Sequence, residues 1–190
     1  MTAGRDVKKH SVTWRNKTIL LTGASSGIGE ALSVALAEKG ATLGLVARRE
    51  ELLADLAARC EAVGGKAMVL PCDVVDPTAL HSAADRFREA HGHIDVMIAN
   101  AGIGGNDPLT RAYDPTSVKK LIDINLLGAV NSIHAVVPQM IERGSGHLVA
   151  ISSLAGFRGL PKSAAYSASK AGMTAFFESV RLDHARTALT

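Results

Sequence analysis

The chain has 190 residues, of which 47% are hydrophobic, so it is long enough for one domain with a sizeable core. No apolar run approaches the ~20 residues of a membrane-spanning helix, which argues against a membrane span. The net charge is only +3, which is not typical of a nucleic-acid-binding protein. Cys60 and Cys72 are too few for a disulfide framework and lack the spacing of metal ligands. We therefore expect buried thiols, no metal site and a cytoplasmic location.

The positive charge is concentrated at the N-terminus, because residues 1–17 contain five basic residues and one acidic residue, Asp6. This segment has no apolar stretch of the length found in a secretory signal. We expect residues 1–16 to form a flexible basic tail in front of one dinucleotide-binding domain, residues 17–190. The alternative for the tail is a weak contact with an anionic surface.

The segment from Lys17 to Glu30 reads as a strand, a glycine turn and a helix start. Residues 18–21 are β-branched or apolar, which suits a strand buried on both faces of a parallel sheet. Gly23, Gly27 and Gly29 then let the backbone approach a ligand, and the amides of the following helix would point at the turn. The segment therefore predicts an anion site, with a simple tight turn as the alternative.

Strand and helix patterns alternate five times along the chain. Such alternation predicts an α/β fold with a doubly wound parallel sheet and helices on both faces. Ligands of such sheets bind outside the carboxyl ends of the strands. The predicted strands are 18–21, 42–47, 67–72, 94–99 and 147–152, and the predicted helices are 28–36, 50–63, 77–90, 115–142 and 164–185.

The end of the second predicted strand bears on cofactor choice. A carboxylate there would bind the adenosine ribose of NAD(H) and repel a 2′-phosphate, but this chain has Ala47, Arg48 and Arg49 instead. A guanidinium offers a donor fork to phosphate oxygens. We therefore predict that Arg48 favours NADP(H), with NAD(H) as the alternative if both arginines are merely solvated.

Tyr166 and Lys170 stand four residues apart and share one face of the last predicted helix. Neither is a useful base at neutral pH with a pKa of about 10. A positive charge at ~4 Å is worth ~4 kcal/mol at an effective dielectric of about 20, enough to bring the pKa of a phenol toward the working range. Taken alone, such a pair of residues is more often solvent-exposed and without a catalytic role.

In order and spacing, these motifs resemble the single-domain branch of the short-chain dehydrogenase/reductase family, from about Lys17 to Asp183. The resemblance implies a Rossmann-like fold. It rests on Thr22–Gly29 (TGASSGIG), Cys72–Val74 (CDV), Asn100–Gly102 (NAG), Asp123–Leu126 (DINL), Ile151–Ser153 (ISS) and Tyr166-x-x-x-Lys170.

The resemblance implies a role for each matching residue. Tyr166 would exchange a proton with the substrate oxygen, and Lys170 would lower the pKa of Tyr166 and hold the nicotinamide ribose. Ser153 would hydrogen-bond the substrate oxygen, and Asn125 would help hold a water of a proton relay; without the family, a harmless exposed asparagine is equally plausible. The implied cofactor-binding residues are Gly23, Ser25, Ser26, Gly27, Ile28, Gly29, Arg48, Asp73, Val74, Asn100, Ala101, Gly102, Tyr166 and Lys170.

Members of this family usually have about 250 residues, so the resemblance implies a C-terminally shortened chain that lacks the last two strands of the sheet. The fifth strand would then be an exposed edge. The implied activity is NADP(H)-dependent interconversion of a small-molecule carbonyl and an alcohol. The alternative, from another class, is a catalytically silent dinucleotide-binding or interaction module.

The resemblance also implies a homodimer or homotetramer in which two helices of each subunit pair. The apolar residues expected at that interface are Leu126, Leu127, Ala129, Ile133, Ala171, Met173, Phe176 and Phe177. The alternative is that these side chains only face the sheet of their own chain.

Overall fold

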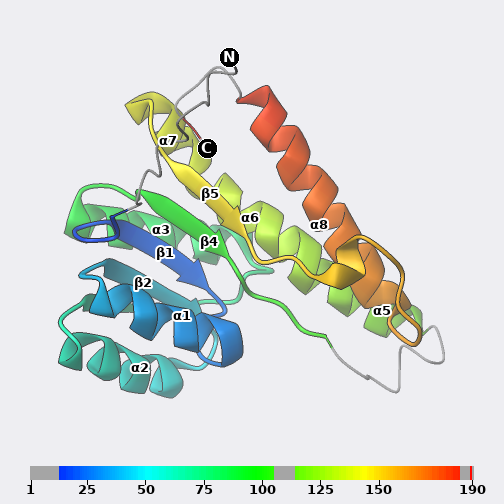
Figure 1. Ribbon diagram of the computed structural model, residues 1–190, viewed down its shortest axis with the longest axis horizontal. Helices are drawn as coiled ribbons and strands as arrows, with labels where there is room; N and C mark the ends of the chain where they lie inside the picture. The colour runs from blue at the N-terminus through cyan, green and yellow to red at the C-terminus, as the bar shows by residue number, and fades with distance from the viewer. Residues whose placement is uncertain (1–12, 105–113, 185–188, 190) are drawn as a thin grey trace, which may run out of the picture.

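The computed structural model describes residues 13–104, 114–184 and 189. Five parallel strands form one sheet in the order β3-β2-β1-β4-β5 (Figure 1). Their bounds are β1 (Thr18–Thr22), β2 (Thr42–Ala47), β3 (Lys66–Pro71), β4 (Val96–Ala99) and β5 (His147–Ala150). The predicted doubly wound α/β fold is confirmed. Residues 1–12 of the predicted basic tail lie outside the described residues.

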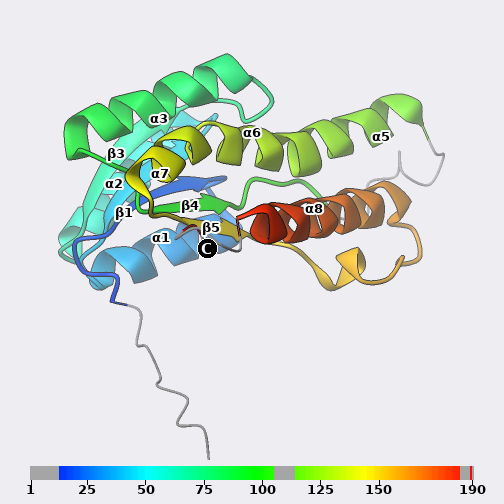
Figure 2. The ribbon, with the colours of Figure 1, turned by 90° about the horizontal axis from the view of Figure 1, so that it is seen from above.

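Helices cover both faces of this sheet (Figure 2). One face carries α1 and α2, and the other carries α3, α6 and α7. The bounds are α1 (Gly27–Glu38), α2 (Glu50–Ala62), α3 (Pro77–His91), α5 (Pro115–Ile122), η1 (Asp123–Leu127), α6 (Gly128–His134), α7 (Val137–Arg143), η2 (Leu154–Gly156) and α8 (Ala164–Asp183).

Each strand divides its side chains between the two cores because successive residues point to opposite faces. In β1, Ile19 and Leu21 pack with α1 and α2, whereas Leu20 packs with Phe87 of α3. All of these side chains are fully buried. Burial on both faces explains why β1 is an unbroken apolar run without polar alternation.

The prediction of one helix over residues 115–142 was wrong in detail, because the segment forms three α-helices and a π-helical turn, η1. The break before α7 has a local cause: Pro138 occupies the start of that helix, where its missing N–H costs no hydrogen bond. By length and composition alone, Pro115–Arg143 meets the criterion for a membrane-crossing helix, with a mean hydropathy of 1.4. A core helix of a soluble protein meets the same criterion.

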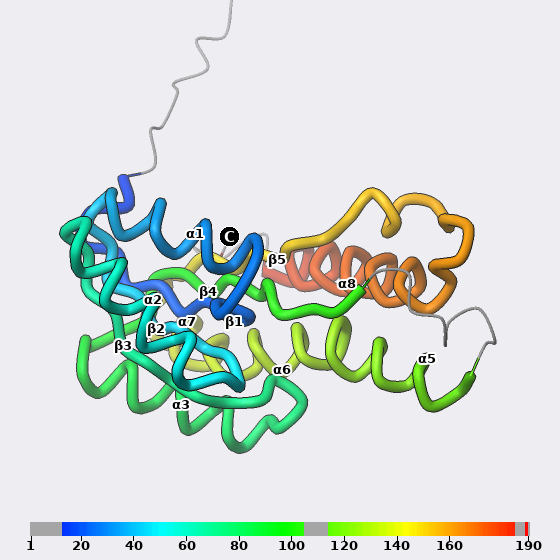
Figure 3. The backbone as a smooth tube through the Cα atoms, turned by 90° about the horizontal axis from the view of Figure 1, so that it is seen from below, coloured from blue at the N-terminus to red at the C-terminus, as the bar shows by residue number. Residues whose placement is uncertain are grey.

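The last long helix, α8, lies beside α5 and η1 and extends past the sheet (Figure 3). Among the described strands, β5 pairs only with β4 and is an edge, as predicted. Leu189 returns to this edge and forms an isolated parallel bridge with Gly146. Its side chain is buried in the α3/α7 core.

The residues expected at a subunit interface do not share one environment. Ala129, Ile133 and Met173 are 3%, 4% and 1% exposed within the single chain, so they belong to its own core. For these three the alternative, packing inside the chain, was the right one. Leu127 is 47% exposed and Ala171 is also exposed, so they remain available for a partner.

Candidate active site

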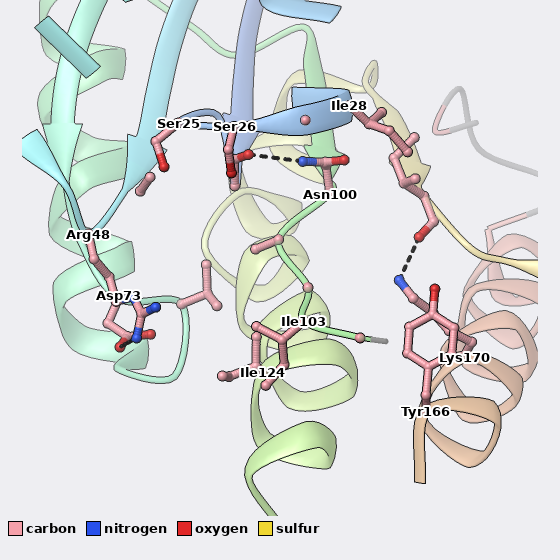
Figure 4. A pocket seen from close by; sticks show the side chains of 18 of the residues that line it. Ser25, Ser26, Ile28, Arg48, Asp73, Asn100, Ile103, Ile124, Tyr166 and Lys170 are labelled. Atoms are coloured by element: carbon pink, nitrogen blue, oxygen red, sulfur yellow. Dashed lines mark hydrogen bonds and ion pairs between the residues drawn. The ribbon is translucent and has the colours of Figure 1, made fainter. Parts of the chain in front are cut away.

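The glycine turn between β1 and α1 is held close to the end of β4. Gly23 has a φ of +69°, and a Cβ there would lie 2.7 Å from the Cα of Ala101. A Cβ on Gly29 would collide with the carbonyl oxygen of Gly23. The Asn100 side-chain amide donates to the carbonyl oxygens of Thr22 and Gly23, at 3.0 and 3.2 Å. The glycines therefore permit a turn that Asn100 fixes (Figure 4).

Three helices begin at this end of the sheet with no side-chain cap on their first amides: α1 after Ser26, α2 after Arg49 and α8 after Ser163. By contrast, α3 and α5 are capped by the carboxylates of Asp76 and Asp114. Unpaired helix amides favour an anion. The uncapped start of α1 follows the glycine turn, so a phosphate would bind there.

Two arginines follow β2 and take different partners. Arg48 forms an ion pair with Asp73, with 3.8 Å between Nη1 and Oδ2. Arg49 donates from Nη2 to the Oγ of Ser25 at 3.0 Å. The structure therefore brings the predicted residues Arg48 and Asp73 together, and it adds Arg49, which the sequence analysis did not place in the site.

Tyr166 and Lys170 lie on the first two turns of α8. Lys170 is 5% exposed, and its Nζ donates to the carbonyl oxygen of Ile151 at 2.8 Å. Burial lowers the pKa of Lys170 from its usual 10.5, because the charged form loses hydration. Tyr166 is only partly buried, beside Gly104, where a Cβ would collide with its ring. Lys170 is thus buried and anchored, and Tyr166 lies beside it on the cavity wall.

Asn125 is fully buried in the π-helical turn η1. Its Oδ1 accepts from the N–H of Ile103, and its Nδ2 donates to the carbonyl oxygen of Ile103 and to the Oγ of Ser169. Ser169 in turn donates to the carbonyl oxygen of Tyr166 at 2.8 Å. Asn125 therefore ties the segment after β4 to α8, and the exposed-asparagine alternative is wrong.

Ser153 is the N-cap of η2 and is partly buried. Its Oγ accepts from the N–H of Ala155 at 3.2 Å. Its neighbour Ser152 shares a hydrogen bond with the Thr174 hydroxyl at 2.8 Å. Within the described part of the chain, Ser152 lines the cavity of the site and Ser153 does not.

One open cavity of about 790 Å³ joins these groups at the carboxyl ends of the strands. It includes every predicted cofactor residue except Gly29, whose role is packing. Asn125 and Ser153 stay outside its lining. The lining residues that sequence reasoning missed are Ala47, Arg49, Cys72, Ile103, Gly104, Ile124, Ile151, Ser152, Leu160 and Ser163.

The residues present fit an extended dinucleotide. The cavity is within the size of small-molecule sites, and Gly27, with a φ of +59°, has no atom within 4 Å of where a Cβ would project. The turn thus leaves its backbone open toward the cavity. Ser25, Arg48 and Asp73 lie on one side of the cavity, with Tyr166 and Lys170 on the other (Figure 4).

Residues 17–190 match the family model for short chain dehydrogenases. The chain belongs to the short-chain dehydrogenase family. It is 40% identical over 175 residues to an uncharacterized oxidoreductase of Listeria innocua, which covers 92% of this chain and 70% of the relative. The family is one of NAD(P)-dependent oxidoreductases.

Two solved structures show the same fold with different cofactors. A metagenomic short-chain oxidoreductase in complex with NADP is similar with a TM-score of 0.86 at 32% identity, covering 94% of this chain and 80% of that one. An NAD+-bound xylitol dehydrogenase has a TM-score of 0.88 at 32% identity, covering 94% and 68%. Membership in the family therefore leaves the choice of cofactor to the residues of this chain.

Proposed function

We propose that this chain carries an NADP(H)-dependent oxidoreductase site that interconverts a carbonyl and an alcohol. The observation that carries the proposal is that Tyr166 and the buried, anchored Lys170 lie together on the wall of the dinucleotide-sized cavity (Figure 4). A lysine that is 5% exposed is costly to bury, which argues against a merely decorative surface pair.

The bound cofactor supplies or accepts the hydride. The chain's part is to orient the reactants and to move a proton at the phenolic oxygen of Tyr166. Tyr166 would give its proton to the substrate oxygen in the reduction, beside the cationic side chain of Lys170. The hydrogen bond to Ile151 holds that charge in place, because the lysine chain is otherwise flexible.

We assign Ser153 to hydrogen-bonding of the substrate oxygen and Asn125 to a positioning role beside the proton path. The side chain of Asn125 forms hydrogen bonds with Ile103 and Ser169. These bonds hold the segment around Gly102 against α8. A water relay from Lys170 would run past this point. The glycine-turn residues that line the cavity, Gly23 and Ser25–Ile28, would hold the pyrophosphate, and Asp73 and Val74 would flank the adenine. Asn100 would steady the sheet beside the cofactor, next to Ala101 and Gly102.

The preference for NADP(H) is supported by charge at the end of β2. Two guanidiniums, those of Arg48 and Arg49, stand where a carboxylate would repel a 2′-phosphate. A small-molecule substrate, a homodimer or homotetramer and a cytoplasmic location remain part of the proposal. The two cysteines are free and buried, which suits a reducing compartment.

Two measurements on the same preparation test the proposal. Fluorescence titration gives the dissociation constants of NADPH and NADH, and a steady-state assay uses a panel of ketones, aldehydes and secondary alcohols. We expect tighter binding of NADPH and turnover of at least one panel member. Tighter binding of NADH would overturn the cofactor preference. Cofactor binding without turnover on any member would instead favour the silent binding module.

A further inference from the structure

The backbone of Gly104 lies in close contact with the ring of Tyr166. A Cβ on Gly104 would lie 2.6 Å from the Cε2, 2.7 Å from the Cδ2 and 3.3 Å from the Cζ of that ring. Carbon atoms in ordinary contact are about 3.5–4.0 Å apart. Gly104 does not have the positive φ that would by itself favour glycine. The space taken by the ring is therefore what requires a glycine at this position.

The two sides of this contact are held by one buried side chain, that of Asn125. It exchanges two hydrogen bonds with Ile103, the residue directly before Gly104. Its Nδ2 also donates to the Oγ of Ser169 at 3.1 Å, and that Oγ donates to the backbone carbonyl oxygen of Tyr166 at 2.8 Å. The backbones of Gly104 and Tyr166 are thus fixed relative to each other.

The phenolic oxygen of Tyr166 forms no hydrogen bond with another residue that the structure describes. Packing, rather than hydrogen bonding, therefore determines where the ring lies. Gly104 and Tyr166 both line the cavity, and Lys170 lies beside the ring (Figure 4). A ring displaced by rotation about its side-chain torsions would move the phenolic oxygen with it.

We propose that Gly104 is a positioning residue for Tyr166: because it has no side chain, the backbone after β4 forms the surface against which the ring packs. The proposal rests on the proposed function of Tyr166 in proton exchange. A methyl group at position 104 would push the ring away by about 1 Å to restore ordinary contact. A misplacement of about 1 Å can lower the rate of an enzymatic reaction by about 10²-fold.

The variant Gly104→Ala separates positioning from a structural role. The ring is the movable end of a side chain, so it yields to the added methyl group and the fold is retained. We expect kcat to fall by about tenfold or more. The melting temperature should stay within about 2 °C of that of the unmodified protein. The dissociation constant of NADPH, from fluorescence titration, should change by less than about threefold, which is well below the loss of kcat.

Gly159→Ala is the matched control. Gly159 is also an exposed glycine, on the segment that leads into α8, but no atom lies within 4 Å of where its Cβ would project. It does not line the cavity. The same substitution there should leave kcat within about twofold of that of the unmodified protein.

Fluorine NMR follows the ring without any turnover. The chain has two tyrosines, Tyr113 and Tyr166, so Tyr113→Phe protein labelled with 3-fluorotyrosine carries a single fluorinated ring. In this background we expect Gly104→Ala to shift the resonance of Tyr166 and Gly159→Ala to leave it in place. The measurement is made without substrate, so it does not depend on the reaction.

Two outcomes would overturn the proposal. One is a Tyr166 resonance that Gly104→Ala leaves where Gly159→Ala leaves it, and the other is a kcat that Gly104→Ala lowers no more than Gly159→Ala does. Absence of turnover in the unmodified protein would instead remove the proposed function. The fluorine resonance would still show whether Gly104 determines the place of the ring, so the two failures are distinguishable.

Discussion

Asn125 and Ile103 exchange two hydrogen bonds: the Asn125 Oδ1 accepts from the Ile103 N–H, and its Nδ2 donates to the Ile103 carbonyl oxygen, both at 2.7 Å. A side-chain amide thus imitates the pairing of a neighbouring strand for the segment that follows β4. This segment forms part of the cavity wall next to Tyr166 and Lys170.

We predict that Asn125→Ala costs about 2–3 kcal/mol in the free energy of unfolding, because the backbone groups of Ile103 lose their partner. It should also weaken cofactor binding, measured by titration. Asn131→Ala is the matched control, since Asn131 makes a single bond to the carbonyl oxygen of Val74 and should cost about 1 kcal/mol. Equal costs in urea unfolding would contradict the bracing role.

Lys170 gives the fold a pH dependence at alkaline pH. Burial lowers its folded pKa below 10.5, so the unfolded chain binds more protons in that window, and stability rises with pH toward 10.5. Lys170→Met removes this gain. We expect the melting temperature of the unmodified protein to rise relative to that of Lys170→Met as the pH approaches 10.5. Lys120→Met, at an exposed lysine of α5, is the control, and its melting temperature should follow that of the unmodified protein at every pH. If the melting temperatures of Lys170→Met and the unmodified protein change with pH in parallel, the charge of Lys170 is not buried.

Asp95 braces the other end of the sheet. Burial alone would raise its pKa, but the hydrogen bond from the Thr18 N–H and the nearby Lys17 and His93 outweigh burial and lower it below 3.8. Its stabilisation is therefore present above pH 3.8 and lost as the pH falls through the folded pKa.

We expect Asp95→Asn to cost about 1–2 kcal/mol at pH 7, with the difference from the unmodified protein vanishing as the pH falls below the folded pKa. Chemical unfolding at several pH values measures it. The surface residue Asp85 pairs with His81 and Arg88, and Asp85→Asn should change stability by less than about 0.5 kcal/mol. A cost for Asp95→Asn that does not depend on pH would exclude ionisation as its cause.

A comparison of Gly23 with Gly64 separates the effect of close packing at the glycine turn from the effect of backbone strain. Both have a left-handed backbone, with φ of +69° and +93°, but a Cβ would meet Ala101 at Gly23 and nothing within 4 Å at Gly64. Gly64→Ala should cost about 1 kcal/mol from backbone strain alone. Gly23→Ala should cost at least about 2 kcal/mol more and weaken cofactor binding. Similar melting temperatures for the two variants would show that the turn is not tightly packed.

The strand positions could be predicted from sequence because β1 and β2 are short apolar runs bounded by glycine or charge. The helix break before α7 could have been predicted from Pro138. The apolar pattern on both sides of this proline instead indicated one continuous helix. The π-helical turn at η1 had no such signal, and neither did the hydrogen bonds of its Asn125 to Ile103 and Ser169. Local pattern does not encode contacts between residues so far apart in the chain.

The site was predictable where motif residues line the cavity, as at the glycine turn, Tyr166 and Lys170. The site was harder to predict where two adjacent residues of the same type could fill the same role. Arg48 and Arg49 are equivalent in sequence, and only the positions of Asp73 and Ser25 distinguish them. Ser152 and Ser153 differ likewise by their partners, Thr174 and the Ala155 N–H.

The central claim is that Tyr166 exchanges the proton in a carbonyl–alcohol interconversion. The most direct test compares Tyr166→Phe with the unmodified protein for turnover and for the dissociation constant of NADPH. We predict a loss of turnover of at least about 10²-fold with cofactor affinity unchanged within a few-fold. Full turnover in Tyr166→Phe would contradict the claim.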